Sequence, residues 1–416
     1  MSPQTITKIV IFFTCFLDAF GIGLVFPLLS PLLLDSAQGF LPLLTSDSMR
    51  GALLGFVLAS YSLAQFFSAP VFGMLSDYKG RRTILIRCVS IAFVGYIIAG
   101  FAIFLKSYCL LLLGRLLEGM ASGSISVTYA TLADISTGRS KIKNFGWLGA
   151  CWSLGFILGP FAGGYLSSNK LSTFFTYATP FWFAAILAII NLLLVFFFFK
   201  ETFTATTKKQ IHLLQGVINL KKAWLLFPLR KMMLAMFIFF IGWEIFALFI
   251  PIFLINRFVF DSLAIGNFYA FLGAGFVIGN TFILRLVSHI PTENLLKIGL
   301  PLFAIYIFPL IYFSSLPFFL AWLSLIPIAG AVIFALGPIH ISNASRADEQ
   351  GEVLGIYQSV QAGALALPPL IFGSLAVLYP SFSIWGSALF SFLSGLVFWF
   401  IKGPKLPKTP INKIFP

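Results

Sequence analysis

The sequence predicts an all-α polytopic membrane protein in which twelve transmembrane helices form two pseudo-symmetric six-helix halves. Of its 416 residues, 59% are hydrophobic and only 10% are charged, whereas soluble domains carry about 25% charged residues. Twelve apolar segments reach the roughly 20 residues that cross a hydrocarbon core. The ~10-residue segments of alternating polarity that a transmembrane β-barrel requires are missing from the sequence. These observations exclude a water-soluble globular protein.

The predicted spans are runs rich in Leu, Ile, Val, Phe and Ala, separated by polar turns. They cover residues 8–34, 50–75, 84–105, 109–133, 145–167, 176–200, 232–256, 264–288, 296–313, 317–341, 352–378 and 381–402. The first resembles a signal peptide in position only. Asp18 lies in its middle and no small-residue cleavage pattern follows it, so we interpret it as a retained span.

The net charge of +14 reflects topology and not a nucleic-acid partner. If the N-terminus is cytoplasmic, 22 of the 27 Lys and Arg residues fall on the inner side. On the outer side lie only Arg50, Lys106, Lys170 and Arg257, and Arg115 lies within a span. This asymmetry follows the positive-inside rule. It predicts that both termini are cytoplasmic.

Six spans precede a basic stretch and six follow it. We therefore predict an N-terminal half at 1–200, a cytoplasmic linker at 201–231, a C-terminal half at 232–402 and a cytoplasmic tail at 403–416. Part of the linker is expected to form an amphipathic helix at the lipid surface. Spans five and eleven both place glycines around a proline. Two repeated halves suggest a transporter whose halves rock about a central site.

The stretch "GMLSDYKGRR", residues 73–82, joins spans two and three. Its first glycine allows a neighbouring helix to approach closely, and Gly80 permits a tight turn. The Asp77 carboxylate is suited to accept hydrogen bonds from the N-terminal amides of a helix in the other half, and Arg81 to pair with Asp134. A solvated topogenic loop would explain the two arginines but not the glycine spacing. We predict a cytoplasmic gate formed by Gly73, Asp77, Gly80, Arg81, Arg82 and Asp134.

Four ionisable residues inside spans are candidates for proton coupling or for the substrate cavity. Asp18 lies in span one, Arg115 and Glu118 lie three residues apart in span four, and Glu244 lies in span seven. A charged group in a membrane is costly unless it is paired or protonated. For each of them the alternative is a structural role: a hydrogen bond for Asp18 and Glu244, and an ion pair for Arg115 and Glu118. Two opposing effects act on the Glu118 carboxyl, because burial favours its protonated form and Arg115 favours its ionised form. A proton carrier requires such a balance, since it must both bind and release the proton.

Span five contains "GFILGPFAGG", in which glycines recur at four-residue spacing. Such a helix has a flat face for close packing, and a proline allows it to bend. The residues concerned are Gly155, Gly159, Pro160, Gly163 and Gly164. The alternative is ordinary glycine-mediated packing without a functional role.

Together these motifs resemble the major facilitator superfamily over essentially the whole chain. Within it the chain is similar to the twelve-span drug:proton antiporters, including the tetracycline-resistance-like exporters. The loop at 73–82 resembles G-x-L-x-D-[RK]-x-G-R-[RK], with Tyr78 in place of the usual basic residue. Span one resembles D-x-x-G-x-G-L-x-x-P, and span four resembles R-x-x-Q-G with Glu118 in place of the usual glutamine. Span five matches G-x-x-x-G-P-x-x-G-G, which in the superfamily is associated with antiporters.

The resemblance implies export of a small amphipathic or lipophilic molecule in exchange for protons. No G-x-x-x-x-G-K-[ST] phosphate loop is present in the sequence, so we expect an ion gradient to supply the energy. We expect no cofactor and no metal, because the four cysteines show no C-x-x-C spacing. The expected partners are the substrate, protons and the lipid bilayer, with no nucleic acid. The expected location is a bacterial cytoplasmic membrane, with a monomer as the functional unit.

Other functions stay open at this point. Within transport, the alternative is a proton-coupled metabolite or siderophore transporter, working by export or by uptake symport. A membrane sensor should carry a signalling domain, yet no soluble segment exceeds about 35 residues. An enzyme should show a nucleophile–base or metal-ligand constellation, and we find none in the sequence.

Overall fold

The computed structural model describes residues 3–136, 139–202, 214–225, 229–344 and 350–400, and this part of the chain contains helices but no strand. Twelve helical segments in it are long and apolar enough to cross a membrane. They are Thr5–Leu34, Asp47–Lys79, Arg81–Phe104, Tyr108–Asp134, Asn144–Leu166, Thr179–Phe198, Arg230–Phe258, Ser262–Leu286, Thr292–Tyr312, Leu316–Ile341, Val353–Leu378 and Phe382–Phe400. Each corresponds to one predicted span. The predicted fold class is confirmed.

Contacts between residues divide the chain into two compact units. The first unit is Met1–Gln215 with Phe260–Ala270, and the second is Gly216–Val259 with Phe271–Pro416. The limit at Gln215 falls inside the predicted linker. The segment Phe260–Ala270 groups with the first unit, although it follows the linker in sequence.

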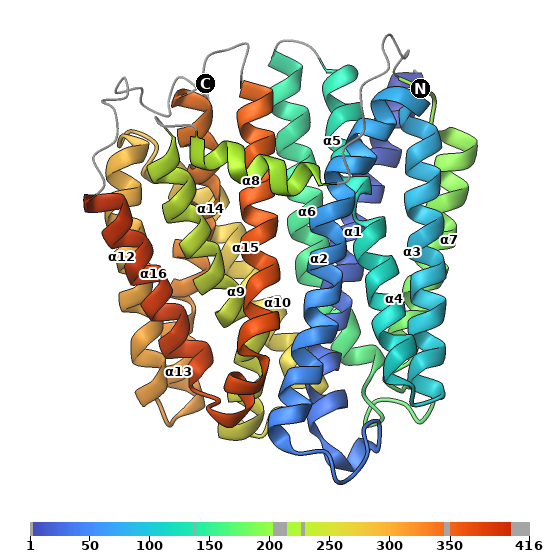
Figure 1. The fold of residues 1–416 in the computed structure, drawn as a ribbon, viewed down its shortest axis with the longest axis vertical. Coiled ribbons are helices and arrows are strands. Elements are labelled where there is room, and N and C mark those ends of the chain that lie inside the picture. The colour runs from blue at the N-terminus through green and yellow to red at the C-terminus, as the bar shows by residue number, and fades with distance from the viewer. Residues whose placement is uncertain (1–2, 137–138, 203–213, 226–228, 345–349, 401–416) are drawn as a thin grey trace. The chain divides into compact units, whose positions relative to one another are not determined.

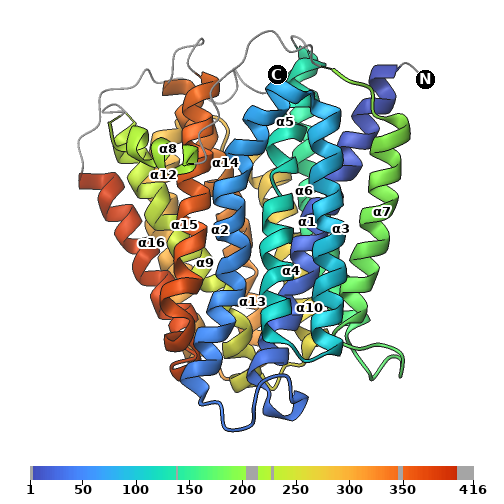
Figure 2. The ribbon, with the colours of Figure 1, turned by 45° about the vertical axis from the view of Figure 1, so that its right-hand side comes forward.

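In the described part of the first unit, seven helices build the first six spans, with α4 and α5 following each other in one span. They are α1 (Pro3–Leu34), α2 (Asp47–Lys79), α3 (Arg81–Phe104), α4 (Tyr108–Ala121), α5 (Ser124–Asp134), α6 (Arg139–Leu166) and α7 (Thr179–Phe198), with a short 3-10 turn, η1 (Ser36–Gln38), after α1. Figure 2 shows α2, α4 and α3 side by side, and α1 packs along α6. Apolar side chains from α1, α3, α5, α6 and α7 form one buried cluster around Ile11, Ile84 and Leu148.

The second unit is built around α9 (Arg230–Phe258), which is the most deeply buried of the spans. Its other elements are α8 (Gln215–Leu225), α10 (Ser262–Ile278, which begins in the first unit), η2 (Gly279–Ile283), α11 (Leu284–Leu286), α12 (Thr292–Ile307), η3 (Phe308–Tyr312), α13 (Leu316–Leu323), α14 (Leu325–Ala344), α15 (Gln350–Leu378) and α16 (Phe382–Phe400). Helix α9 packs against α15 and α16. The ring of Trp243 lies 5.2–6.1 Å from the rings of Phe276, Phe303 and Phe334, so this core is mainly aromatic.

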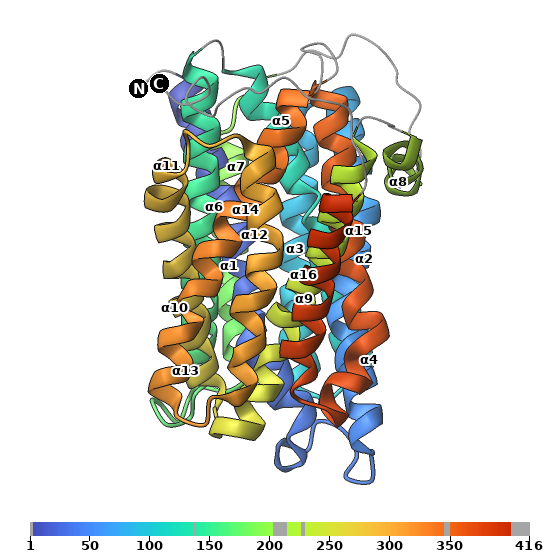
Figure 3. The ribbon, with the colours of Figure 1, turned by 90° about the vertical axis from the view of Figure 1, so that its left-hand side faces the viewer.

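Helix α8 lies in the predicted linker and crosses the long helices of the second unit at a steep angle (Figure 1). In Figure 3, a side view of the same ribbon, α8 is seen along its own axis. Asn219 Nδ2 donates to Ser359 Oγ of α15 at 2.9 Å. Trp224 is exposed beside Arg230, whose guanidinium lies 5.3 Å from the indole. An exposed tryptophan with flanking lysines is typical of a membrane-interface helix. The lipid contact itself stays a prediction.

The fourth span is not one continuous helix, because α4 ends at Ala121 and α5 begins at Ser124. Gly123 occupies the break. A Cβ atom there would overlap the Phe72 ring of α2. At the break the amides of Gly123, Ile125 and Ser126 bond to carbonyl oxygens three residues earlier, so the backbone passes through one tighter turn between α4 and α5. This local feature positions the site described next.

Candidate functional site

Asp18 lies on α1 facing the break in the fourth span. It is partly buried, and its Oδ2 accepts a hydrogen bond from Ser124 Oγ, the first residue of α5, at 2.6 Å. The turn between α4 and α5 therefore supplies a hydroxyl donor to an acid that lies within the membrane-spanning part of the chain.

The structure explains the spacing of the glycines that follow Asp18. A Cβ atom on Gly21 would overlap the hydroxyl of Tyr96 from α3, and a Cβ atom on Gly23 would lie 2.7 Å from Cδ of Pro160 in α6. Gly21 thus lets a tyrosine hydroxyl reach α1 one turn from Asp18. Gly23 lets α1 pack against the proline of the glycine-rich helix.

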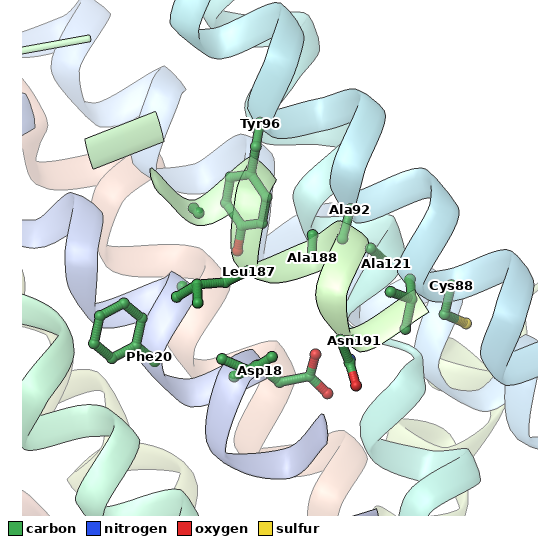
Figure 4. A pocket seen from close by; sticks show the side chains of 13 residues that line it. Asp18, Phe20, Cys88, Ala92, Tyr96, Ala121, Leu187, Ala188 and Asn191 are labelled. Carbon is green, nitrogen blue, oxygen red and sulfur yellow. The ribbon is translucent and has the colours of Figure 1, made fainter. Parts of the chain in front are cut away.

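A small cavity of about 30 Å³ adjoins Asp18 between α1, α3, α4 and α7. Its polar lining includes Asp18, Tyr96 and Asn191 (Figure 4). Asn191 is 2% exposed, and its Oδ1 accepts a hydrogen bond from Thr14 Oγ1 at 2.9 Å. Asn191 was not among the predicted site residues. The available signal was its position as the one amide side chain in the otherwise apolar sixth span.

Arg115 and Glu118 form the predicted ion pair on α4, between Arg115 Nη1 and Glu118 Oε2. Both side chains are almost fully buried, with exposed fractions of 3% and 2%. The guanidinium also lies 4.7 Å from the centre of the Tyr61 ring, a cation–π distance. Within the described residues, Arg115 Nε and Glu118 Oε1 are buried without hydrogen-bond partners. An incompletely satisfied buried ion pair costs stability, which suggests a function beyond packing.

The two acidic sites of the first unit lie against consecutive residues of α3. Tyr96 lines the Asp18 cavity, and a Cβ atom on its neighbour Gly95 would lie 3.1 Å from Cγ of Glu118. The structure thus brings Asp18 and the Arg115–Glu118 pair to the same turn of α3.

Glu244 belongs to the second unit, so the structure does not group it with the other candidates. It is partly buried on α9 next to the aromatic core around Trp243. Among the described residues we find no hydrogen bond or ion pair for its carboxylate. Its assignment to proton or substrate binding therefore stays a prediction.

The predicted cytoplasmic gate centres on Arg81 at the start of α3. The predicted pair is present: Arg81 Nε lies 2.9 Å from Asp134 Oδ2 at the end of α5. Arg81 Nη1 also donates to Asp77 Oδ1 at 2.5 Å and to Ser76 Oγ at 2.6 Å. Arg81 is 4% exposed. One buried guanidinium thus ties the ends of α2 and α5 to the beginning of α3.

Three further residues of this motif are Gly73, Asp77 and Arg82. At Gly73 a Cβ atom would meet Ser126 Cβ at 3.5 Å, an ordinary contact distance, so packing inside the first unit does not explain this glycine. The expected role of Asp77 toward the amides of another helix stays a prediction. Arg82 donates to the Phe196 carbonyl oxygen and lies over its ring at 5.4 Å.

Glu201, just after α7, contacts the predicted gate motif and was not among the predicted site residues. Its Oε1 accepts from Arg81 N at 2.9 Å and its Oε2 accepts from Arg82 N at 3.1 Å. The carboxylate thereby caps the N-terminus of α3, where backbone amides lack helical acceptors. A contact across 120 residues has no local sequence signal.

Gly80→Ala should destabilise the protein by about 1–3 kcal/mol, because Gly80 has φ +91° and ψ 148°, a conformation that side chains rarely adopt. An added Cβ would also meet Glu201 Oε2 at 2.5 Å. Thermal unfolding of the purified protein measures the effect. The matched control is Gly146→Ala on α6, where a Cβ atom would meet nothing within 4 Å. Equal melting temperatures for the two variants would contradict this account of the turn.

The glycine-rich face of α6 packs directly on α1. Cβ atoms on Gly155, Gly159 and Gly163 would overlap the carbonyl oxygens of Phe16, Phe20 and Leu24, respectively. The four-residue spacing on both helices gives three successive backbone contacts of this kind, as small-residue motifs do in membranes. Gly164 faces another way, and a Cβ atom there would lie 2.7 Å from the Ser262 carbonyl oxygen and 3.0 Å from Gly266 Cα.

Gly163→Ala should lower stability by about 1–3 kcal/mol, because the added methyl group overpacks the α1 contact. Gly149→Ala is the control on the same helix, since a Cβ atom there would meet nothing within 4 Å. Alanine is a better helix former than glycine, so the control should be neutral or slightly stabilised. A destabilised control with an unchanged Gly163→Ala would show that the contact with α1 is not what requires glycine.

The end of α6 is tied to the segment Phe260–Ala270 by polar contacts within the first unit. Ser167 Oγ donates to Ser262 Oγ at 3.0 Å, and Lys170 Nζ pairs with Asp261 Oδ2 at 2.7 Å. Partial burial raises the pKa of the Asp261 carboxyl, but hydrogen bonds from Lys170 and from Ala264 N lower it by more. Its pKa therefore lies below the usual value. Asp261 stays ionised and caps α10.

Comparison with known proteins agrees with the fold and the motifs. The sequence profile of the Major Facilitator Superfamily matches residues 11–362. The chain belongs to this superfamily. Its members are transporters, so at the level of the family the chain is a membrane transporter and not an enzyme.

Two curated members of the superfamily show its similarity to drug-resistance proteins. Tetracycline resistance protein, class B, from Escherichia coli is 30% identical over 411 residues, which cover 95% of this chain and 93% of the relative. Quinolone resistance protein NorA from Staphylococcus aureus is 32% identical over 200 residues, covering 48% of this chain and 46% of that protein. Of the solved structures, a D-xylose-proton symporter matches with a TM-score of 0.77 at 16% identity, over 98% of this chain and 99% of the other. At that identity the match supports the fold alone.

Proposed function

We propose that this superfamily member exports a small amphipathic or lipophilic organic molecule from the cytoplasm in exchange for protons. The observation that carries the proposal is the group of acids within spans of the first unit: Asp18 beside a cavity, and Glu118 paired with Arg115. Acids in such positions are retained in membranes mainly for function. The similarity to tetracycline resistance protein, class B, extends over 95% of the chain and makes tetracyclines the first substrates to test.

The predicted site residues fall into three roles in this mechanism. Protons bind to Asp18, Glu118 or Glu244, and Arg115 supplies the counter-charge when Glu118 is ionised. The contacts of Arg81 hold the inner ends of α2, α3 and α5 together when the cytoplasmic side is closed. The glycine face of α6 allows α1 and α6 to move as one body. The protein works as a monomer in the bacterial cytoplasmic membrane, with both termini cytoplasmic and with no cofactor.

The proton gradient is large enough for this work. One charge moving through 100 mV releases about 2.3 kcal/mol, and one pH unit adds about 1.4 kcal/mol. For a neutral substrate and one proton, the sum supports a concentration ratio of a few hundred.

The test is accumulation of a chemical panel in cells with and without the gene, with and without a protonophore. The panel should contain tetracyclines, quinolones, lipophilic cations and siderophores. The proposal expects lower accumulation of at least one drug-like compound in the expressing cells, and loss of the difference when the protonophore is added. Protonophore-sensitive uptake would instead support the alternative of a metabolite or siderophore symporter. A difference that survives the protonophore would remove proton coupling.

A further inference from the structure

The cavity beside Asp18 contains more hydrogen-bonding capacity than its walls satisfy. Asp18 Oδ2 is bonded to Ser124, whereas Oδ1 makes no hydrogen bond within the described part of the chain. Asn191 Oδ1 is bonded to Thr14, but its Nδ2 has no partner among the described residues, and neither has the Tyr96 hydroxyl. Figure 4 shows the Asp18 carboxyl and the Asn191 amide next to each other, with the Tyr96 hydroxyl directed into the same space.

These three groups form a complementary set. The carboxylate oxygen accepts, the amide nitrogen donates, and the hydroxyl does both. A polar group that lacks a protein partner gains free energy by bonding to water, and these three groups face one cavity. A water molecule needs two to four polar partners and roughly 10–15 Å³ of space. The cavity of about 30 Å³ meets both conditions.

We propose that this cavity binds at least one water molecule, which bridges Asp18 to Asn191 and Tyr96 and stabilises the Asp18 carboxylate after it releases its proton. The inference deepens the proposed function and rests on it, because it takes Asp18 to be a proton carrier. It assigns Asn191 and Tyr96 as positioning residues for the water. It also explains Gly21, since a side chain there would displace the Tyr96 hydroxyl.

The ligand set does not suit a metal ion. Hard cations such as Ca²⁺ need six or more oxygen ligands. The side chains of the cavity offer one unpaired carboxylate oxygen and one hydroxyl, because the oxygen of Asn191 is already bonded to Thr14.

Other titratable or charged groups on the surrounding helices do not replace the water. Those that interact electrostatically with Asp18, Tyr61 or Tyr96 are Cys15 of α1, Tyr61 of α2, Cys88 of α3, and Arg115 and Glu118 of α4. The charges of Arg115 and Glu118 compensate each other. Helix α7 carries no charged residue and faces Asp18 only with Asn191 and apolar side chains.

The experiment is an infrared titration of the purified protein, which needs no transported substrate. The carboxyl band that disappears in Asp18→Asn is assigned to Asp18. Its titration is followed in the wild type, in Asn191→Leu and in Tyr96→Phe. Tyr165→Phe is the matched control, because Tyr165 lies at the far end of α6, with its ring centre 4.5 Å from that of Phe161. A cryo-EM map is examined in parallel for density in the cavity.

We expect density for water in the wild type, and a deprotonation midpoint of Asp18 about one pH unit higher in both cavity variants than in the control. Tyr96→Phe removes a single oxygen atom, so it remains interpretable if Asn191→Leu does not fold. Midpoints equal to that of Tyr165→Phe, or an empty cavity in the map, would overturn the inference. A midpoint that changes when Na⁺ is replaced by choline would overturn it in favour of a cation.

Failure of the proposed function gives a different result. If the Asp18 band does not titrate in the wild type, Asp18 is not a proton carrier, and the density in the cavity alone then decides whether water is bound. If Asp18 titrates with the expected shifts but transport is insensitive to protonophores, the water site stands and antiport fails.

Discussion

Glu118→Gln should abolish pH-driven accumulation of substrate while preserving substrate binding and downhill exchange. Glutamine keeps the shape of the side chain, and its oxygen can still accept from Arg115 Nη1, but it cannot release a proton. Glutamine is also the residue usual in the related motif. The stacking of Arg115 on Tyr61 at 4.7 Å limits the cost of removing the counter-charge. The accumulation ratio in energised vesicles should fall from the hundreds that one proton permits to about one.

The measurement compares accumulation with binding in the same preparation. Glu293→Gln is the matched control, because Glu293 makes a half-exposed pair with Lys297 on α12 and should keep full accumulation. If Glu118→Gln concentrates substrate normally, Glu118 is only a structural partner of Arg115. Asp18 or Glu244 would then have to carry the proton.

Arg81→Gln should remove most transport and lower the stability of the protein. Arg81 is almost fully buried, and its loss leaves Asp77 and Asp134 without their shared cation. Removing one partner of a buried ion pair costs about 3–5 kcal/mol. The cost here should lie toward the low end, because the side chains of Asp77 and Asp134 are 37% and 19% exposed and solvent screens them.

Two further variants separate gating from folding. Arg87→Gln removes an arginine from the exposed face of the same helix and should leave transport and melting temperature unchanged. Adding Asp134→Asn to Arg81→Gln removes the uncompensated carboxylate, and should restore part of the stability but not the transport rate. Restoration of wild-type transport in the double variant would show that the ion pair is structural and not part of a gate.

The sequence was sufficient for the spans because their signal is local. Twenty apolar residues bounded by charges specify a membrane helix whatever surrounds it. The Arg115–Glu118 pair was equally accessible, because residues three apart share a helix face. The pairing of Arg81 with Asp134 required the additional knowledge that the second and fourth spans end on the same side.

What could not be predicted depends on contacts between distant segments. Glu201 caps α3 across 120 residues, and nothing near either residue indicates it. The interruption of the fourth span at Gly123, where a Cβ atom would overlap the Phe72 ring of another helix, places Ser124 against Asp18. The sequence shows Asn191 as the one amide side chain of the sixth span, but only the folded chain shows that it shares a cavity with Asp18.

The most direct test of the central claim, proton antiport, uses inside-out membrane vesicles whose lumen corresponds to the cell exterior. Tetracycline is the first probe, followed by any compound that the cellular panel identifies. When the lumen is acidified, the account predicts that the compound moves into the lumen as protons leave, and that Glu118→Gln vesicles show no such movement. Movement of the compound out of the lumen together with the protons would identify a symporter and contradict the account.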